Sequence, residues 1–346
     1  MIQAALAAAA AFDTPGRPLE AAPLGEGVGH IHRSFRVTCE QGAVVLQRLN
    51  ERVFPDLGAV MANMERVTAH LGAKLPSALT LAPARGGGHL HRDASGAWRC
   101  TRFIEGGRMP LEPATPADAH AAARALGGFL NAMSDFPVAD LRIPIPGFHD
   151  TAARLAAFIA AVERDSHRRV DDARPLIEAA LAHATLADAL TGRGLPLRPV
   201  HNDTKLANVL LDAKSGEGLC VLDLDTVMPG LSAHDVGDLV RSAAFDGGED
   251  DAEARLDLDR LRALSEGYRE GAAETLSDAE RAVFGLGARV ITYELGLRFL
   301  MDHLEGDVYF GAARPGQNLA RARAQFARLH ALEAQSGIIE GILNPR

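Results

Sequence analysis

The chain has 346 residues, a formal net charge of −9 and 47% hydrophobic residues. This length allows one large domain or two smaller ones, and the hydrophobic content is sufficient for a buried core. The acidic balance argues against nucleic acid as a partner, because nucleic-acid binding favours basic surfaces, although a metal ion and local basic groups still allow a polyphosphate to bind.

The cysteines and the apolar start indicate the compartment. Cys39, Cys100 and Cys220 lie far apart, without the spacing of a disulfide framework or a zinc site, so we expect inert thiols in a reducing environment. The apolar run 1–12 has no basic residue before Arg17, whereas a secretion signal needs a positive start. We therefore interpret residues 1–12 as an N-terminal helix and not as a secretion signal. No run reaches the roughly 18 apolar residues of a membrane span. A cytoplasmic protein without membrane contact is predicted.

The first hundred residues are expected to form a small sheet with one inserted helix. After a Pro- and Gly-rich lead-in at 13–25, interpreted as irregular, alternating apolar and polar residues predict a strand at 35–39 with a hairpin partner at 43–49. Apolar residues at helical spacing predict a helix over 56–73. Two further strands are expected, near 79–81 and 98–103.

A loop at 104–110 has several turn residues and no hydrophobic periodicity, which makes it the best boundary between two domains, 1–103 and 111–346. The second domain should be mostly helical, with helices at 116–134, 150–165, 170–190, 257–270, 278–304 and 316–336. Between the third and fourth helices, a short β segment is expected at 199–211 and 219–226, joined by a turn at 213–218. The fold class is therefore α+β.

The chemistry concentrates in residues 201–208, His-Asn-Asp-Thr-Lys-Leu-Ala-Asn, and in the Asp-Leu-Asp that follows. Phosphoryl transfer needs an aligned acceptor hydroxyl, magnesium on the phosphates and little covalent chemistry. Asp203 is the candidate for orienting the hydroxyl and accepting its proton. Asn208 and Asp223 offer the hard oxygen ligands that Mg²⁺ prefers. Asp225 shares a face with Asp223 and is either a second metal ligand or a hydrogen-bonding support.

Two neighbours in the same loop have supporting roles. Lys205 is expected either to contact the γ-phosphate or to balance the charge of Asp203, and His201 to support the loop through hydrogen bonds. The alternative for Asp203 and Asn208 is that both are turn formers whose side chains cap backbone groups.

The loop resembles the catalytic loop of the aminoglycoside phosphotransferase/choline kinase superfamily. A closer similarity is to N-acetylhexosamine 1-kinases, carried by several stretches of the chain. These are 45–50 with Val53-Phe54, 146–151, 201–205, 221–230, 235–241, 294–310, Asn318-Leu319 and 321–323. The resemblance implies a bilobal, protein-kinase-like fold with an N-lobe at 1–103, a hinge at 104–110 and a C-lobe at 111–346.

The resemblance also implies a nucleotide site. Its phosphate loop would be formed by Gly25, Gly27 and Gly29, because glycine lets the backbone approach phosphates closely. The segment that offers backbone donors and acceptors to adenine would include Arg102, Phe103, Ile104 and Glu105. On the inserted helix, Glu65 would pair with a basic residue of the sheet.

Two positions depart from the wider superfamily. Kinase-like sheets often carry a phosphate-binding Lys or Arg where this chain has Gln47. Gln47 is assigned to the nucleotide site, but the residue that clamps the phosphates stays open, and Lys205 takes a larger share of that contact. His32 stands where the hexosamine kinases would have Asn.

Sugars are held by planar polar groups and carboxylates that recognise the hydroxyl pattern. The candidates for sugar contacts are His149, Arg298, Asp307 and Tyr309, with Asp150 and Asp302 as further polar residues. Their alternative roles are caps, surface ion pairs and packing. Three residues are expected to brace the catalytic loop, namely Asp235, Asp238 and Arg241.

Together these features predict a monomeric, ATP- and Mg²⁺-dependent kinase that phosphorylates the C1 hydroxyl of GlcNAc or GalNAc. One alternative is a kinase for an aminoglycoside, choline or homoserine hydroxyl. Cationic acceptors need acidic clusters or aromatic cages, and one Trp and three Tyr disfavour a cage. The other alternative is a nucleotide-binding pseudokinase that acts by interaction, against which the intact Asp203, Asn208 and Asp223 argue.

Overall fold

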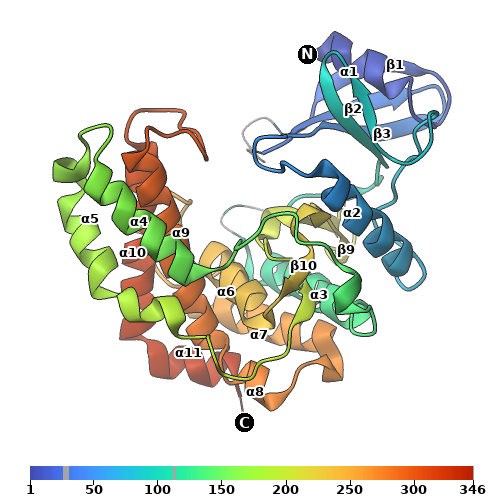
Figure 1. The fold of residues 1–346 in the computed structure, drawn as a ribbon. Coiled ribbons are helices and arrows are strands. Elements are labelled where there is room, and N and C mark those ends of the chain that lie inside the picture. The colour runs from blue at the N-terminus through green and yellow to red at the C-terminus, as the bar shows by residue number, and fades with distance from the viewer. Residues whose placement is uncertain (26–30, 111, 113, 346) are drawn as a thin grey trace.

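A five-stranded antiparallel sheet dominates the N-terminal part of the computed structural model, which describes residues 1–25, 31–110, 112 and 114–345 (Figure 1). The strand order is β1-β2-β3-β5-β4. The strands are β1 (Pro18–Pro23), β2 (Arg33–Cys39), β3 (Gly42–Arg48), β4 (His91–Asp93) and β5 (Gly96–Arg102). Helix α1 (Ile2–Ala9) packs on one face, where its alanines join a buried cluster with Phe35, Val37 and Trp98.

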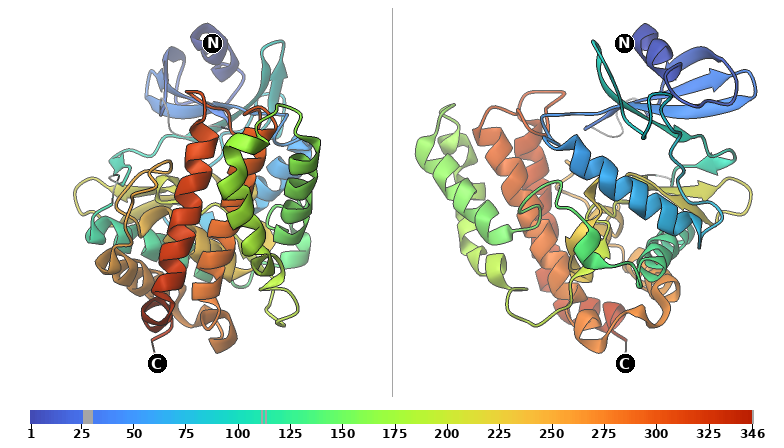
Figure 2. Two further views of the ribbon diagram at one scale, coloured as in Figure 1. Left: turned by 90° about the vertical axis from the view of Figure 1, so that its left-hand side faces the viewer. Right: turned by 45° about the vertical axis from the view of Figure 1, so that its right-hand side comes forward.

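Helix α2 (Leu57–Gly72) connects the sheet to the rest of the molecule. Figure 2 shows it between the sheet and the helical part. Its residues Val60, Met64 and Val67 belong to the same buried cluster as the C-terminal helices. Asn63 donates hydrogen bonds to the backbone oxygens of Arg142 and Val227, at 2.9 and 3.0 Å. The inserted helix is therefore anchored to the larger part of the molecule.

Two details of the predicted sheet are wrong. The lead-in interpreted as irregular contains β1, which begins and ends with proline and lies at the edge of the sheet. Proline is tolerated there because an edge strand can spare a backbone donor. Residues 79–81 form no named strand and contribute one bridge, from Leu81 to Thr101, so the remaining edge strand is β4.

The C-terminal part is mostly helical, as predicted. Its helices are α3 (Pro116–Ala132), α4 (Thr151–Arg164), α5 (Val170–Ala182), α6 (Ser232–Ala243), α7 (Leu258–Ala272), α8 (Asp278–Arg281), α9 (Phe284–Leu304), α10 (Gln317–Ala334) and α11 (Ser336–Leu343). The helix expected to run to 190 ends at Ala182 and is followed by a 3₁₀ turn, η2 (Ala184–Asp188). The helix expected from 278 is interrupted after α8.

Helices α6 and α11 are absent from the prediction. Eleven of the twelve residues of α6 are buried, and these include polar residues such as Asp235 and Asp238 as well as its apolar ones. Gly237 lies where α6 crosses α9. A Cβ added there would lie 2.5 Å from the carbonyl oxygen of Gly287. The glycine therefore permits the close approach that fixes α6 beneath the site described below.

Two small sheets carry the β segment that the sequence predicted. Strand β7 (Arg198–Val200) pairs with β10 (Met228–Gly230), and β6 (Gly107–Arg108), β8 (Val209–Asp212) and β9 (Gly218–Val221) form the second sheet. Strand β6 belongs to the segment interpreted as a loop, so that segment pairs with the larger part. The domain boundary itself stays a prediction.

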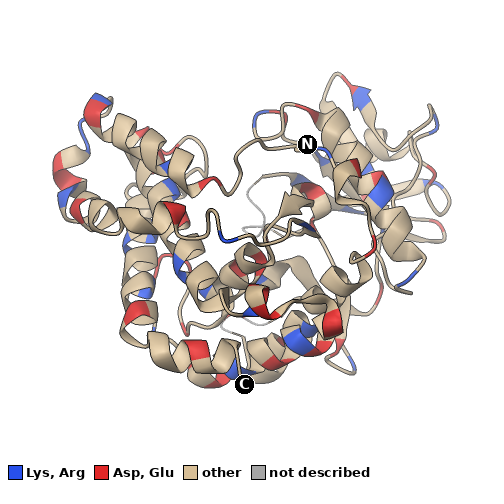
Figure 3. Cartoon of the chain, turned by 60° about the horizontal axis from the view of Figure 1, so that its bottom comes forward, with Lys and Arg blue, Asp and Glu red and all other residues tan. Residues whose placement is uncertain are grey.

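Basic and acidic residues are interspersed over the visible elements in Figure 3. Among the described helices, none is both long enough and apolar enough to cross a membrane.

Candidate active site

Helix α6 holds the loop that follows β7. The carboxylate of Asp235 accepts hydrogen bonds from the backbone N–H groups of His201 and Asn202, at 2.9 and 2.7 Å. The Thr204 hydroxyl donates to the backbone oxygen of Asp235 at 2.5 Å. Asn202 has a φ of +63°, a left-handed conformation that Asn tolerates better than most residues. Asp235 therefore braces the loop, as predicted.

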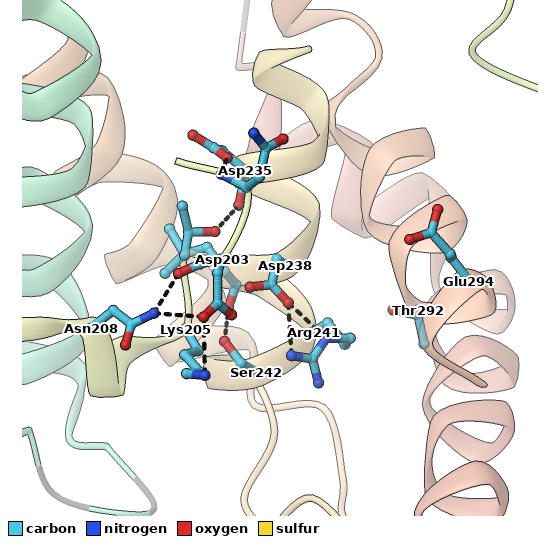
Figure 4. A network of polar contacts seen from close by, with 12 residues as sticks. Asp203, Lys205, Asn208, Asp235, Asp238, Arg241, Ser242, Thr292 and Glu294 are labelled. Atoms are coloured by element: carbon cyan, nitrogen blue, oxygen red, sulfur yellow. Dashed lines mark hydrogen bonds and ion pairs between the residues drawn. The ribbon is translucent and has the colours of Figure 1, made fainter. Parts of the chain in front are cut away.

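Three predicted residues meet at the end of this loop, as Figure 4 shows. The Asn208 amide donates to the carboxylate of Asp203 at 2.9 Å, and Lys205 Nζ lies 3.1 Å from the same oxygen. Burial raises the pKa of Asp203, but Lys205 and His201 outweigh it and the net shift is downward. Asp203 raises the pKa of Lys205 in return. Asp203 is therefore an ionised carboxylate beside a charged lysine.

The next turn, η4 (Leu224–Thr226), brings Asp223 to the same place. His201 Nε2 lies 2.8 Å from the Leu222 carbonyl, and the Thr226 hydroxyl donates to the His201 carbonyl at 2.7 Å. Burial raises the pKa of Asp223, and the charges of Asp225 and Asp203 raise it further. No hydrogen bond from the described residues reaches the Asp223 carboxylate.

This environment fits a divalent cation. The amide nitrogen of Asn208 is directed to Asp203, which leaves its carbonyl oxygen as a possible ligand. The backbone oxygen of Asn208 accepts from Leu222 N–H at 2.7 Å, so Asn208 and Asp223 lie on adjoining segments. Among the described residues, no group of three or more His, Cys, Asp and Glu side chains is arranged so that it could hold a metal ion by itself. Few protein ligands suit Mg²⁺, which usually keeps several waters and is bound together with phosphates.

Asp225, the third predicted metal ligand, contacts side chains of the N-terminal part of the molecule. Asp225 is 2% exposed and receives a two-pronged ion pair from Arg99 on β5, with 2.7 Å between Arg99 Nη2 and Asp225 Oδ2. His32 Nε2 lies 2.7 Å from the same oxygen. Arg99 Nε donates to Gln47 Oε1 at 2.8 Å. These contacts favour the alternative role of Asp225 as a hydrogen-bonding support, and its role as a metal ligand stays a prediction. Sequence reasoning missed Arg99, which is named in no motif.

The predicted nucleotide residues come from several strands of the sheet, with Gln47 on β3. Gly25 follows β1 with a φ of +75°, while Gly27 and Gly29 fall outside the described residues. Arg102 ends β5 and pairs with Asp13 at 3.1 Å.

The residues after β5 leave backbone groups available. Phe103 N–H donates to the Ala43 carbonyl at 3.3 Å, and Arg36 lies over the Phe103 ring at 4.8 Å. No hydrogen bond from the described part of the chain occupies the backbone of Ile104 or Glu105. Their role in binding adenine stays a prediction. Glu65 pairs with His89 at 2.7 Å, outside the strands of the sheet.

A pocket of about 140 Å³ opens beside Asp203 and Lys205. Of the sugar-contact candidates it includes His149, Arg298 and Tyr309, but not Asp307, which pairs with Arg169 at 2.6 Å. Asp150 and Asp302 cap local structure: they accept backbone N–H groups of Ala153, and of Tyr309 and Phe310. Sequence reasoning assigned no individual role to several lining residues, among them Phe148, Glu294, Phe299, Phe310 and Arg321, and it interpreted Glu249 as part of a solvated loop.

The charges of the pocket are unequally paired. Its carboxylates Glu294, Asp238 and Glu249 pair with His149, Arg241 and Arg321, at 2.9, 2.7 and 3.3 Å. Arg298 has no carboxylate partner among the described residues. Its guanidinium carbon lies 5.2, 5.7 and 5.3 Å from the ring centroids of Phe148, Tyr309 and Phe310. The pocket thus presents a buried arginine that is framed by aromatic rings and has no carboxylate within ion-pair distance among the described residues.

His149 links the pocket to the catalytic loop. Its Nδ1 lies 2.9 Å from Glu294 and its Nε2 3.1 Å from the Asn202 carbonyl, so the protonated ring can donate to both. Burial lowers the pKa of His149, but Glu294 outweighs burial and Arg298, and the net shift is upward. Burial raises the pKa of Glu294, but His149 brings it down to about 2. The ring of His234 lies 4.9 Å from that of His149 and is tilted by 53°; burial and His149 lower the pKa of His234 to about 3.

We therefore expect an alkaline loss of stability that depends on His149. A histidine with a raised folded pKa stabilises fully below its ordinary value of 6.5, and that contribution is lost as the pH rises through the folded pKa. At pH 6, His149→Gln should lower the free energy of unfolding by about 3–5 kcal/mol, because Glu294 is left buried and unpaired. The difference in unfolding free energy between the wild type and His149→Gln should become smaller above pH 6.5. Urea unfolding between pH 6 and 9 measures it.

The matched control is His183→Gln. His183 pairs with Glu333 at 3.1 Å, but both side chains are about one third exposed. An exposed pair contributes about 0–1 kcal/mol, so this variant should follow the wild-type pH profile. Parallel pH profiles for the wild type and His149→Gln would contradict the expectation.

Comparison with known proteins bears on the family and on the fold. The model of the phosphotransferase enzyme family matches residues 23–273. A choline/ethanolamine kinase family protein from Mesorhizobium loti has a similar structure, with a TM-score of 0.58 and 19% identity over 94% of this chain and 92% of that one. A microcompartment-associated aminopropanol kinase has a TM-score of 0.62 and 16% sequence identity, and the match covers 98% of both chains. A spectinomycin phosphotransferase in complex with ADP and spectinomycin has a TM-score of 0.61 and 10% sequence identity, and the match covers 96% of this chain and 98% of that one. At these identities the likeness concerns the fold, and it confirms the predicted α+β, kinase-like architecture.

Proposed function

Because the chain belongs to the phosphotransferase enzyme family, we propose that it transfers the γ-phosphoryl group of ATP to the C1 hydroxyl of an N-acetylhexosamine, GlcNAc or GalNAc. The observation that carries the proposal is a pocket lined both by an ionised Asp203 and by Arg298, which has no carboxylate within ion-pair distance among the described residues. The resemblance of residues 294–310 and 146–151 to hexosamine 1-kinases supports the acceptor.

In this proposal Asp203 accepts the proton of the C1 hydroxyl while the oxygen forms a bond to the γ-phosphorus. The bond between that phosphorus and the β–γ bridging oxygen breaks, and ADP leaves. Lys205 holds Asp203 in its ionised form and would contact the transferred phosphoryl group. Asn208 and Asp223 would hold Mg²⁺, which supplies neutralisation of the phosphate charge. The Asp235 braces keep the loop in place throughout, because they do not involve the reacting groups.

The charge of the pocket favours a neutral acceptor over a cationic one. Ethanolamine and aminopropanol, for which two of the fold neighbours are named, carry an ammonium group. Such a group needs a carboxylate or an aromatic cage free of other cations. Here Arg298 already occupies the aromatic frame, and the pocket carboxylates are paired. Arg298 can donate to a neutral acceptor such as an acetamido carbonyl.

An acceptor panel tests the proposal. ADP release would be measured with GlcNAc, GalNAc, glucose, ethanolamine, choline and kanamycin, and phosphorus NMR of the product would locate the phosphate. We expect turnover with the N-acetyl sugars and a C1 phosphate. A preference for an amine acceptor, or phosphate on another hydroxyl, would overturn the sugar assignment. ATP binding without turnover on any acceptor would favour the pseudokinase.

The proposal includes a monomeric enzyme of the cytoplasm. Cys39, Cys100 and Cys220 are free and buried. Burial raises the pKa of both Cys100 and Cys220 to about 12, so these thiols are unreactive. Free thiols of this kind are compatible with a reducing compartment.

A further inference from the structure

A buried arginine stands next to the position where kinase-like sheets carry a cation. Gln47 on β3 is paired in register with Arg99 on β5, and the Arg99 side chain reaches across to donate to Gln47 Oε1 at 2.8 Å. The Gln47 amide in turn donates to the Ser34 hydroxyl on β2 at 3.1 Å. Arg99 is 1% exposed. The sheet therefore keeps a positive charge here, supplied from the neighbouring strand.

The positive charge of Arg99 does not pair with Glu65 of the inserted helix, which was expected to pair with a basic residue of the sheet. The helix carboxylate, Glu65, pairs with His89, and both side chains are partly exposed. Arg99 instead forms its two-pronged pair with Asp225, and both side chains are 1% exposed. A buried carboxylate needs such a partner, because an isolated charge in the interior is strongly unfavourable. The ion pair joins the sheet to the turn η4, which begins directly after Asp223.

His32 completes the arrangement from the other side. The backbone N–H of Asn50 donates to His32 Nδ1 at 3.0 Å, which assigns the ring proton to Nε2. His32 Nε2 then donates to Asp225 Oδ2 at 2.7 Å. Asp225 is thus held from β5 by Arg99 and from the residue just before β2 by His32.

We propose that Arg99 is a positioning residue for the metal and the nucleotide phosphates, acting through Asp225. Arg99, Gln47 and His32 fix Asp225, and Asp225 fixes the turn from which Asp223 would reach Mg²⁺. The fold thereby replaces the missing sheet lysine by an arginine one strand away. The inference rests on the nucleotide and metal of the proposed function, and it does not depend on the identity of the acceptor.

Calorimetric titration with ADP, with and without Mg²⁺, tests this without any acceptor. The measured quantity is the ratio of the two ADP dissociation constants. Arg99→Lys keeps the charge but loses the planar, two-pronged geometry. We expect the Mg²⁺-dependent gain in affinity to fall by about 10- to 100-fold, as is usual when a group that orients a metal ligand is lost. The double variant Gln47→Lys/Arg99→Gln places a cation on β3 instead of β5. Its Mg²⁺-dependent gain in ADP affinity should be larger than that of Arg99→Gln alone.

The control is Arg92→Lys. Arg92 lies on β4 of the same sheet and pairs with Glu51 at 2.5 Å, with both side chains about half exposed. This variant should keep the wild-type ratio. Circular dichroism and thermal unfolding would establish that each variant is folded. If Arg99→Lys only lowers the melting temperature and leaves the ratio unchanged, Arg99 is merely structural and the inference is wrong. If the wild type itself shows no Mg²⁺-dependent ADP binding, the proposed function fails instead.

Discussion

Asp203→Asn is expected to leave the fold intact and to lower kcat by roughly 10²- to 10⁴-fold, the usual contribution of a positioned general base. Asparagine has the same shape and can still accept the hydrogen bond from Asn208, so the loop should keep its conformation. It cannot take up the proton of the acceptor hydroxyl. The effect should appear in kcat, whereas ADP affinity in the presence of Mg²⁺ should change little. Steady-state ADP release and calorimetry measure the two quantities.

The matched control for this variant is Asp135→Asn. Asp135 also pairs with a lysine, Lys74, but it lies on the surface with a side chain that is 67% exposed. Its replacement should leave kcat unchanged. Wild-type turnover in Asp203→Asn would rule out Asp203 as the base and with it the proposed mechanism.

The parts of the site that the sequence predicted are those built from short-range contacts. Asp203, Lys205 and Asn208 lie within one loop of six residues, so their spacing alone brings them together. Asp223 follows β9, which pairs with β8 directly after Asn208. A hairpin and a loop of this kind are visible as strand alternation, turn residues and fixed spacing. These signals do not depend on the rest of the fold.

The remaining contacts depend on distant parts of the chain. Asp225 appears beside Asp223 in the sequence, but its partner Arg99 lies 126 positions away on another sheet. Asp307 was grouped with Arg298 and Tyr309 by proximity in sequence, yet it turns to Arg169, 138 positions away. In both cases tertiary pairing of a charge decides where the side chain points, and spacing carries no information on it.

Secondary structure follows the same division. Helices with one apolar face, such as α2, α7 and α10, are located to within a few residues. Helix α6 has apolar residues at helical spacing, such as Val236, Leu239 and Val240, and was nevertheless missed. Its polar residues are buried because tertiary partners hold them, as the backbone N–H groups of the catalytic loop hold Asp235. Strand β1 is formed by a Pro-rich segment whose pairing with β2 is set by the sheet and not by its own composition.

Asp223→Asn should separate activity from stability. Loss of the ligand removes several kcal/mol of charge stabilisation by the metal, so we expect turnover at saturating Mg²⁺ to fall by roughly 10²- to 10³-fold. Without Mg²⁺, however, Asp223 is repelled by Asp225 and Asp203, which together with burial raise its pKa. Removing its charge should therefore raise the melting temperature in EDTA above that of the wild type, and added Mg²⁺ should stabilise only the wild type.

Asp225→Asn, two residues further on, is the matched comparison with the opposite expectation. Burial raises the pKa of Asp225, but Arg99 and His32 outweigh it and lower the pKa overall, so its charge is stabilised in the folded state. Losing that charge leaves Arg99 buried without an anion and should cost about 3–5 kcal/mol of unfolding free energy. If the melting temperature rises in Asp223→Asn and falls in Asp225→Asn, the Asp223 carboxylate serves to bind Mg²⁺, whereas the Asp225 carboxylate neutralises Arg99. Equal destabilisation by both would mean that Asp223 is also a structural residue, and the metal assignment would then be wrong.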